Sequence, residues 1–297
     1  MSNSSSPHTT PSSSGKPEIS WPLERPTDPP AEFGPRVEAE LRRRSADVHD
    51  HLSETDEATV PFKDLLPNHS RSLSGIASRS FLLGIALGSC VFAWWYNFYI
   101  AETPLWRPPF FVSTLALFHY LEFWIHAKYN LPKATTDTFL LNANGWQYNA
   151  AHGLGMLEAI ITSSYYPRWQ SHFSYTIIQW TGLAFIVMGQ TVRTVAMATA
   201  GTNFHHVVQH KKEKGHQLVQ HGIYGVLRHP SYFGFFWWAI GTQLVLGNVF
   251  CLFMYIAVLW MFFNKRIRSE ERYLTNFFGE EYSKYRGRTI VGIPLIP

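Results

Sequence analysis

Residues 232–263 read YFGFFWWAIGTQLVLGNVFCLFMYIAVLWMFF, a run without a single charged side chain. Gly247 and Asn248 divide this run into two apolar segments, 232–247 and 249–263. Glycine and asparagine are turn formers, and each flanking segment is apolar enough to lie in a bilayer. The stretch therefore predicts a tight helical hairpin that crosses a membrane and returns.

Further apolar segments precede this hairpin along the chain. They cover residues 81–101, 108–127, 146–165 and 174–199. Together with the hairpin they predict an all-α, polytopic integral membrane protein with about six transmembrane helices. Cys90 and Cys251 both lie inside apolar runs, so the sequence predicts neither a disulfide framework nor a thiol metal site.

Lysine and arginine are distributed unequally between the two sides of this arrangement. One side carries Lys63, Arg71, Arg79, Lys128, Lys133, Lys211, Lys212, Lys214, Arg228, Lys265, Arg266, Arg268, Arg272, Lys284, Arg286 and Arg288. The opposite loops hold only Arg107 and Arg168. The positive-inside rule then predicts that both termini and the 200–231 loop face the cytosol. Because the basic residues flank apolar runs, their pattern favours membrane topology over nucleic-acid binding.

The first 75 residues have a different composition from the rest. They are rich in serine, proline, threonine and charged residues, and cannot bury enough apolar surface to offset the entropy lost on ordering. We therefore expect residues 1–75 to form a disordered cytosolic tail. Residues 76–297 are expected to form the membrane domain, with its functional site mainly within 190–290.

Several charged and polar side chains fall inside the predicted spans. His119, Glu122 and His126 share one helical face, while Glu158 and Arg193 lie in the following spans. Intramembrane charges usually face the bundle interior and pair with one another. Two interpretations stay open: a structural ion pair between Arg193 and one of the glutamates, or a polar cavity lined by Arg193.

The 200–231 loop contains many histidines. They are His205, His206, His210, His216, His221 and His229. Only one pair is adjacent, and no carboxylate pair is spaced to join them, so we expect no metal site. Ser231 follows a proline at a span entry and lacks the strand–turn–helix context of a hydrolase nucleophile.

The ends of the hairpin bring charged residues together. Arg266 and Glu270 are four residues apart, so they share a face of the amphipathic helix expected over 264–277 at the membrane surface. A short hairpin places them beside Arg228 and His229, which precede the fifth span. An arginine there can hold a carboxylate, and a glutamate can hold ribose hydroxyls or an ammonium group.

Three segments of this region carry a family resemblance. HQLVQHGIYGVLRHPSYFG (216–234), RSEERYL (268–274) and FFGEEYSKY (277–285) resemble the isoprenylcysteine carboxyl methyltransferases. RTVAMATAGTNFHHVVQ (193–209) is similar to their eukaryotic, endoplasmic-reticulum branch. The resemblance is dense from about residue 185 to 295 and, over the first three spans, is mainly one of topology. It implies methyl transfer from S-adenosylmethionine to the α-carboxylate of a carboxyl-terminal prenylcysteine on processed CaaX proteins.

The same resemblance implies roles for individual residues. It assigns to the cofactor Gln209, His216, Gln217, Leu218, Val219, Tyr224, His229, Pro230, Ser231, Tyr232 and Glu270. It assigns Arg266 to the substrate carboxylate and thus to catalysis. The prenyl tail is expected to pass aromatic residues such as Phe235, Trp237 and Trp238, for which simple packing is the alternative.

Other functions remain open at this point. A phospholipid N-methyltransferase would use the same cofactor, but its amine acceptor has no obvious use for Arg266. A sterol reductase-like oxidoreductase shares part of the RHPSY pattern but usually has more spans. A membrane scaffold without catalysis is the third alternative, and cofactor binding distinguishes it from the enzymes.

Overall fold

The structure is a computed structural model that describes residues 62–173, 175–212 and 215–297. The chain divides into two units, Met1–Thr59 and Val60–Pro297, and the description concerns the second. Most of the tail expected at residues 1–75 therefore lies outside the described residues. Helix α2 begins at Leu73, with Ser72 as its N-cap.

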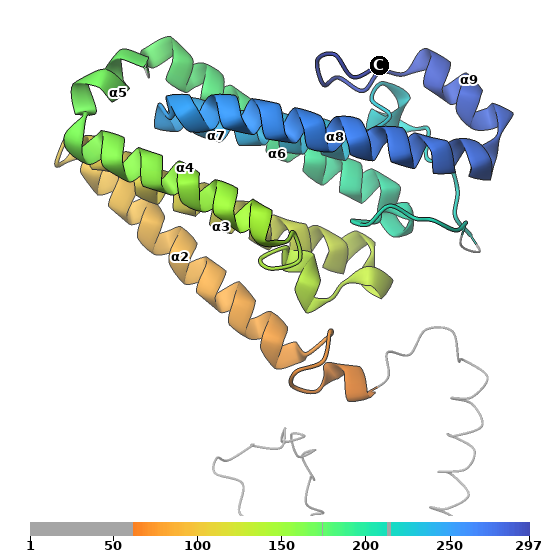
Figure 1. Cartoon of the computed structure of the whole chain (residues 1–297). Helices are drawn as coiled ribbons and strands as arrows, with labels where there is room; N and C mark the ends of the chain where they lie inside the picture. The colour runs from red at the N-terminus through yellow and green to blue at the C-terminus, as the bar shows by residue number, and fades with distance from the viewer. Residues whose placement is uncertain (1–61, 174, 213–214) are drawn as a thin grey trace, which may run out of the picture. The chain divides into compact units, whose positions relative to one another are not determined.

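Helices account for the regular structure of the described residues, which contain no strand (Figure 1). The longer helices are α2 (Leu73–Tyr99), α3 (Arg107–Tyr129), α4 (Trp146–Tyr165), α5 (Pro167–Phe173), α6 (Thr176–Ala200), α7 (Pro230–Leu246), α8 (Val249–Phe278) and α9 (Glu280–Arg288). Short 3-10 turns are η1 (Phe62–Leu65), η2 (Pro104–Trp106), η3 (Leu131–Lys133), η4 (Thr136–Phe139), η5 (Gly201–Asn203) and η6 (Gly222–Gly225). This confirms the all-helical expectation for the described part of the chain.

Each apolar segment singled out in the sequence lies on one of these helices. Within the residues that the structure describes, three helical segments are suited by length and composition to cross a membrane: Leu73–Tyr99, Thr176–Asn203 and Val249–Phe278. None of the residues of α2 is buried within the protein, although its composition is strongly apolar. Such a surface is stable only in contact with lipid or another apolar partner. The chain is therefore a multi-pass membrane protein.

Helix α8 differs from the sequence expectation. The sequence predicts a span that ends at residue 263 and a separate amphipathic helix from residue 264, whereas the structure has one continuous helix of 30 residues. No glycine or proline interrupts this segment, so nothing breaks its backbone hydrogen bonds. Gly279, with φ of 56°, ends it and starts α9. Arg266 and Glu270 therefore stand on a rigid extension of the membrane helix.

Helices α6 and α7 approach each other closely along two pairs of glycines. Gly189 faces Gly234. About two helical turns away, Gly182 faces Gly241. A Cβ atom on Gly189 would lie 2.5 Å from the carbonyl oxygen of Gly234, and one on Gly234 equally close to that of Gly189. Only residues without a side chain allow two helix backbones to pack this tightly. The contact carries Arg193 on α6 to the N-terminal end of α7.

The turn between α7 and α8 closes the end of the bundle away from the 201–229 loop. Gly247 adopts a left-handed conformation with φ of 70°, as the expected tight hairpin requires. The Asn248 amide donates hydrogen bonds to the Gly155 carbonyl and to Gln243 Oε1, both at 2.8 Å. Glu158 accepts from the backbone amides of Phe250 (3.0 Å) and Cys251 (2.7 Å). Glu158 therefore caps the first turn of α8 from α4 rather than pairing with Arg193.

Replacing Glu158 by alanine should destabilise this end of the bundle. The change leaves two amides at the start of α8 without acceptors and removes a negative charge from the positive end of the helix dipole. Loss of such a cap lowers the free energy of unfolding by about 0.5–2 kcal/mol. Thermal unfolding of the purified protein should show a lower midpoint for Glu158→Ala, with Glu158→Gln in between. An unchanged midpoint for alanine would contradict the capping role.

Candidate functional site

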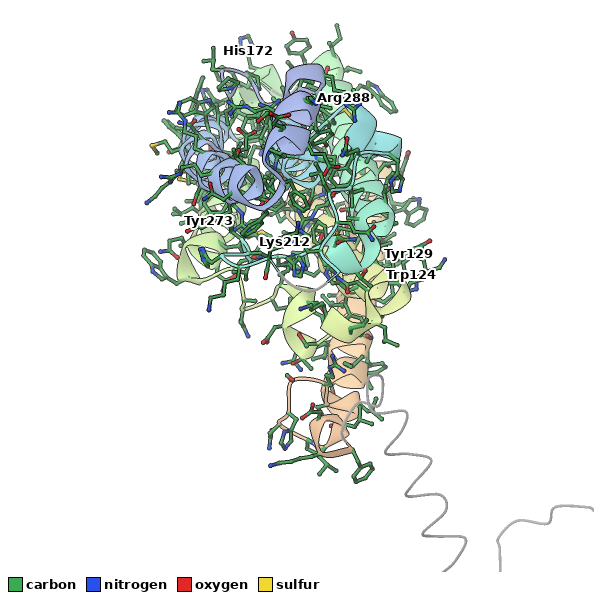
Figure 2. All side chains as sticks on the ribbon, turned by 90° about the vertical axis from the view of Figure 1, so that its right-hand side faces the viewer. Trp124, Tyr129, His172, Lys212, Tyr273 and Arg288 are labelled. Carbon is green, nitrogen blue, oxygen red and sulfur yellow. The ribbon has the colours of Figure 1, made fainter. Side chains whose placement is uncertain are left out.

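A pocket lies where the loop after α6 and the starts of α7 and α9 surround the distal half of α8. Figure 2 looks onto this end of the bundle, where Lys212, Tyr273 and Arg288 are labelled. The pocket is lined by Ala200, Asn203, Phe204, His205, His216, Gln217, Leu218, Val219, Tyr224, Arg228, His229, Pro230, Ser231, Tyr232, Glu270, Leu274, Phe278, Tyr282 and Tyr285. Aromatic rings, one carboxylate and several histidines thus share one wall.

The N-terminal end of α7 supplies the inner side of this pocket. Pro230 occupies the first turn, where its fixed φ suits a helix and its missing N–H leaves no bond unmade. His229 precedes it and stacks on Tyr232, with ring centres 5.4 Å apart and an interplanar angle of 6°. The proline therefore fixes the direction in which His229, Ser231 and Tyr232 leave the backbone.

Arg228 lines the pocket and fixes its wall through buried hydrogen bonds. Its guanidinium donates to Glu271 Oε1 at 2.6 Å, to the Thr289 carbonyl at 2.8 Å, and to the Pro297 carbonyl. Its backbone amide also donates to the Ile290 carbonyl at 3.0 Å. Both side chains of the Arg228–Glu271 pair are buried. This hydrogen bonding commits Arg228 to holding α7, α8 and the C-terminal segment together.

Arg266 and Glu270 meet at one hydroxyl group. Arg266 Nε donates to the Tyr232 hydroxyl at 2.8 Å, and that hydroxyl donates to Glu270 Oε2 at 2.5 Å. The guanidinium also bonds the carbonyl of His206 and lies 5.8 Å from the centre of the Phe262 ring, which is half exposed on the apolar part of α8. Glu270 lines the pocket, whereas Arg266 stands one helical turn nearer the membrane-spanning part of α8.

The loop residues predicted to bind a cofactor come to the same pocket, with one exception. Every predicted residue lines it except Gln209, whose side-chain amide donates to the Val207 carbonyl at 3.0 Å. The Gln217 backbone amide donates to Asn203 Oδ1 at 2.9 Å, which fixes the loop against the end of α6. The Tyr285 hydroxyl donates to the Tyr224 carbonyl at 2.8 Å, and burial raises the pKa of the Tyr224 phenol above its usual value.

The intramembrane charges form a buried network beneath this pocket. Glu122 accepts two hydrogen bonds from Arg193, one of them to Oε2 at 2.8 Å. Arg193 Nη1 also donates to the Ser231 hydroxyl at 2.8 Å. His206 stacks on His126 with ring centres 4.5 Å apart, and burial lowers its pKa well below the usual value. The structure therefore pairs Arg193 with Glu122 and uses the pair to hold Ser231.

Several lining residues were not identified from the sequence. They are Ala200, Asn203, Phe204, His205, Leu274, Phe278, Tyr282 and Tyr285, and Glu271 contacts Arg228 next to them. Leu274, Phe278 and Tyr285 are apolar or aromatic residues of α8 and α9, and no pattern in the sequence connects them to a pocket. The sequence does not predict a role for Glu271, because its buried partners Arg228 and His229 are far away in the chain.

The aromatic residues expected along the prenyl path have different environments. Trp238 is fully buried and packs on Phe118, with ring centres 4.5 Å apart, so its role is packing between α3 and α7. Trp237 donates to the Gly292 carbonyl at 3.4 Å. Phe235 lies closest to the charged network, with its ring centre 5.6 Å from the Arg193 guanidinium.

Histidines are numerous near the pocket but do not form a metal-binding arrangement in the part of the chain that the structure describes. No group of three or more histidine, cysteine, aspartate or glutamate side chains is placed there to hold an ion. His205 and His216 have ring centres 6.0 Å apart, and His216 faces Phe278. These rings therefore belong to the aromatic wall of the pocket.

Comparison with known proteins places this pocket in a family. The model of the isoprenylcysteine carboxyl methyltransferase family matches residues 180–276. A protein-S-isoprenylcysteine O-methyltransferase of Saccharomyces cerevisiae is 44% identical over 232 residues, which are 75% of this chain and 92% of the yeast protein. The chain belongs to the isoprenylcysteine carboxyl methyltransferase family. The enzyme of the same name from Schizosaccharomyces pombe is 39% identical, over 77% of this chain and 98% of the relative.

A solved structure agrees with this membership. It is described as the eukaryotic intramembrane Ras methyltransferase, isoprenylcysteine carboxyl methyltransferase, and matches with a TM-score of 0.69 at 36% identity. The match covers 75% of this chain and 77% of the solved chain. The segment matched by the family model contains every pocket-lining residue except Phe278, Tyr282 and Tyr285. The part of the chain that builds the pocket is thus the part that defines the isoprenylcysteine carboxyl methyltransferases.

Proposed function

We propose that this protein transfers a methyl group from S-adenosylmethionine to the α-carboxylate of a carboxyl-terminal prenylcysteine. The observation that carries the proposal is the Tyr232 hydroxyl shared by Arg266 and Glu270. It joins a polar, aromatic pocket on one side to apolar membrane helices on the other. The relatives at 44% and 39% identity are named for this reaction, which supports the proposal.

Arg266 is the residue we assign to the substrate carboxylate. Its planar guanidinium suits two parallel hydrogen bonds to a carboxylate, and it stays charged at every physiological pH. The half-exposed Phe262 ring beside it continues into the apolar surface of α8, so a lipid tail bound there would lie along hydrocarbon. The ammonium form of an amine acceptor would instead be repelled by this guanidinium. The position therefore suits an anionic head on a greasy tail.

The pocket residues fit a sulfonium nucleoside. Glu270 offers a carboxylate to ribose hydroxyls or to an ammonium group, and the rings of Tyr224, Phe278 and Tyr282 offer faces to a purine or a cation. When bound, S-adenosylmethionine supplies a methyl group on positively charged sulfur. The proposed cofactor residues are those that line the pocket: His216, Gln217, Leu218, Val219, Tyr224, His229, Pro230, Ser231, Tyr232 and Glu270.

The protein's own contribution is alignment. A terminal carboxylate has a pKa near ~3.5 and is ionised at neutral pH, so no residue has to remove a proton. Arg266 would orient one carboxylate oxygen, and Tyr232, fixed from both sides, would hold the acceptor at the edge of the cofactor pocket. Holding two reactants in line can supply several orders of magnitude in rate.

The topology proposed from the sequence completes this assignment. We propose six spans, corresponding to α2, α3, α4, α6, α7 and the first half of α8, with both termini and the pocket in the cytosol. The resemblance to the eukaryotic branch of the family supports the endoplasmic reticulum membrane as the location and processed CaaX proteins as partners. Residues 1–75 would be a cytosolic tail attached to a membrane methyltransferase domain at 76–297.

Transfer of labelled methyl from S-adenosylmethionine to N-acetyl-farnesylcysteine tests the proposal directly. Membranes containing the protein should methylate this acceptor and should leave its carboxamide analogue unmodified, because only the free acid offers a carboxylate. Phosphatidylethanolamine serves as the competing acceptor. Binding of the cofactor with methylation of the amine alone would replace the acceptor assignment, and absence of cofactor binding would refute the methyltransferase assignment.

A further inference from the structure

Three exposed basic residues form a stripe along α8. Lys265, Arg268 and Arg272 follow one another at spacings of three and four residues, so they lie on one face of the helix, and each is exposed. Arg268 donates to Asn264 Oδ1 and Arg272 to the Arg268 carbonyl. None of these three residues forms an ion pair with a carboxylate in the part of the chain that the structure describes.

The nearby carboxylates are committed elsewhere. Glu270 accepts from Tyr232, and Glu271 is buried against Arg228. The stripe therefore presents three positive charges for which the described part of the chain places no counterion on the same face. A counterion from outside the chain would reach all three without breaking an existing ion pair.

The same face is apolar nearer the start of α8. Val258 and Met261 precede Lys265 by seven and four residues, and their exposed fractions are 48% and 57%. The stripe thus passes without interruption from apolar to basic side chains along one continuous helix. This change from apolar to basic side chains along the helix matches the change from acyl chains to headgroups across a bilayer leaflet.

The length of α8 sets the depth of the basic residues. The apolar segment 249–263 has fifteen residues and spans about 22 Å, while the hydrocarbon core of a bilayer is about 30 Å thick. Lys265 therefore lies close to the edge of the hydrocarbon, and its long side chain extends toward the phosphate level. Arg268 and Arg272, one and two turns further along, lie at the level of the headgroups.

We infer that Lys265, Arg268 and Arg272 form a binding surface for the headgroups of anionic phospholipids in the leaflet on the pocket side. The surface is distinct from the pocket, because Arg266 and Glu270 face Tyr232 on another side of the same helix. Anionic lipid held there would fix the depth of α8 and with it the position of the pocket relative to the bilayer. Binding of this kind weakens with salt, since it rests on charge.

Spin-labelled lipids measure whether the full-length protein prefers anionic over zwitterionic phospholipids. The measurement does not depend on catalytic activity. The protein is reconstituted in phosphatidylcholine vesicles carrying a trace of labelled phosphatidylserine or labelled phosphatidylcholine, and the motionally restricted fraction of each is compared. The wild type should favour phosphatidylserine. The variant Lys265→Gln/Arg268→Gln/Arg272→Gln should lose at least roughly fivefold of that preference, the effect expected for one basic residue near the surface.

Matched variants decide where the preference resides. Lys128→Gln/Lys133→Gln/Lys284→Gln removes the same net charge from other elements and should keep the preference; Lys128 lies over Trp124 and Tyr129, both labelled in Figure 2. Lys265→Arg/Arg268→Lys/Arg272→Lys keeps the charge of the stripe and should therefore keep the preference for phosphatidylserine. An equal loss in the matched triple variant, or a wild type that does not distinguish the two lipids, would overturn the inference.

Discussion

Methylation of a prenylcysteine acceptor should fall by about a hundredfold or more when Arg266 is replaced by alanine. Arg266 is the cation that reaches the Tyr232 hydroxyl from the membrane side, and its loss leaves the carboxylate without a bidentate partner. We expect the acceptor to bind more weakly and to be misaligned, so kcat and the KM for the acceptor should both worsen. Methyl-transfer kinetics in membranes with equal protein amounts measure both constants.

Comparison with Glu270→Gln separates the two binding functions. Glu270 lines the pocket, so its substitution should mainly raise the KM for S-adenosylmethionine and leave the KM for the acceptor less affected. Arg266→Lys keeps the charge but not the planar fork and should recover only part of the activity. Lys284, whose side chain is 82% exposed on α9, supplies the control Lys284→Ala, which should match the wild type. Equal effects of Arg266→Ala and Glu270→Gln on both KM values would contradict the division of roles.

Alanine at Gly189 or Gly234 should prevent α6 and α7 from packing as they do. The added Cβ would lie 2.5 Å from a backbone carbonyl oxygen of the facing helix, a distance at which backbone has to move. Overpacking against side chains lowers the free energy of unfolding by about 1–3 kcal/mol. A backbone carbonyl cannot relieve such a contact by changing rotamer, as a side chain can. The free energy of unfolding should therefore fall by more than that range. The thermal midpoint and the yield of monodisperse protein measure the loss.

Helix α2 provides the control for this prediction. Gly84 and Gly88 also lie within a membrane-spanning helix, but a Cβ atom on either would meet nothing within 4 Å. Gly84→Ala and Gly88→Ala should accordingly leave the thermal midpoint unchanged or raise it slightly, because alanine is the better helix former. Equal destabilisation at Gly84 and Gly189 would show that loss of glycine in general, and not the close α6–α7 contact, controls stability.

Alanine at Gly189 or Gly234 should also distort the pocket, because the α6–α7 contact positions residues that line it. Arg193 lies four residues after Gly189, and its guanidinium reaches Ser231 at the start of α7. A shift between the two helices would therefore move Ser231 and Tyr232 relative to Glu270. We expect Gly234→Ala to impair cofactor binding even in the fraction of protein that remains folded.

Local sequence does not predict that α8 continues without a break past residue 263 or that α9 follows it, but it does predict the helices that carry the apolar segments. Apolar segments of nearly bilayer length predict them, and Gly247–Asn248 predicts the turn that joins α7 to α8. The spacing of Arg266 and Glu270 predicts a common face, and the RHPSY segment predicts the wall of a site. These features depend only on periodicity, turn chemistry and the expense of placing charge in hydrocarbon, so they can be read from neighbouring residues.

Only the tertiary structure decided which charged groups pair and which remain at the site. From sequence, Arg193 could pair with either glutamate or line a cavity, and only the family resemblance distinguished Arg266 from Arg228. The structure places Glu122 against Arg193, Glu158 at the start of α8, and Glu271 against Arg228, while Arg266 and Glu270 meet at Tyr232. Partner choice depends on distances between segments 43 to 93 residues apart along the chain. Those distances are set by how closely helices pack, as at Gly189 and Gly234, and no local pattern in the sequence encodes them.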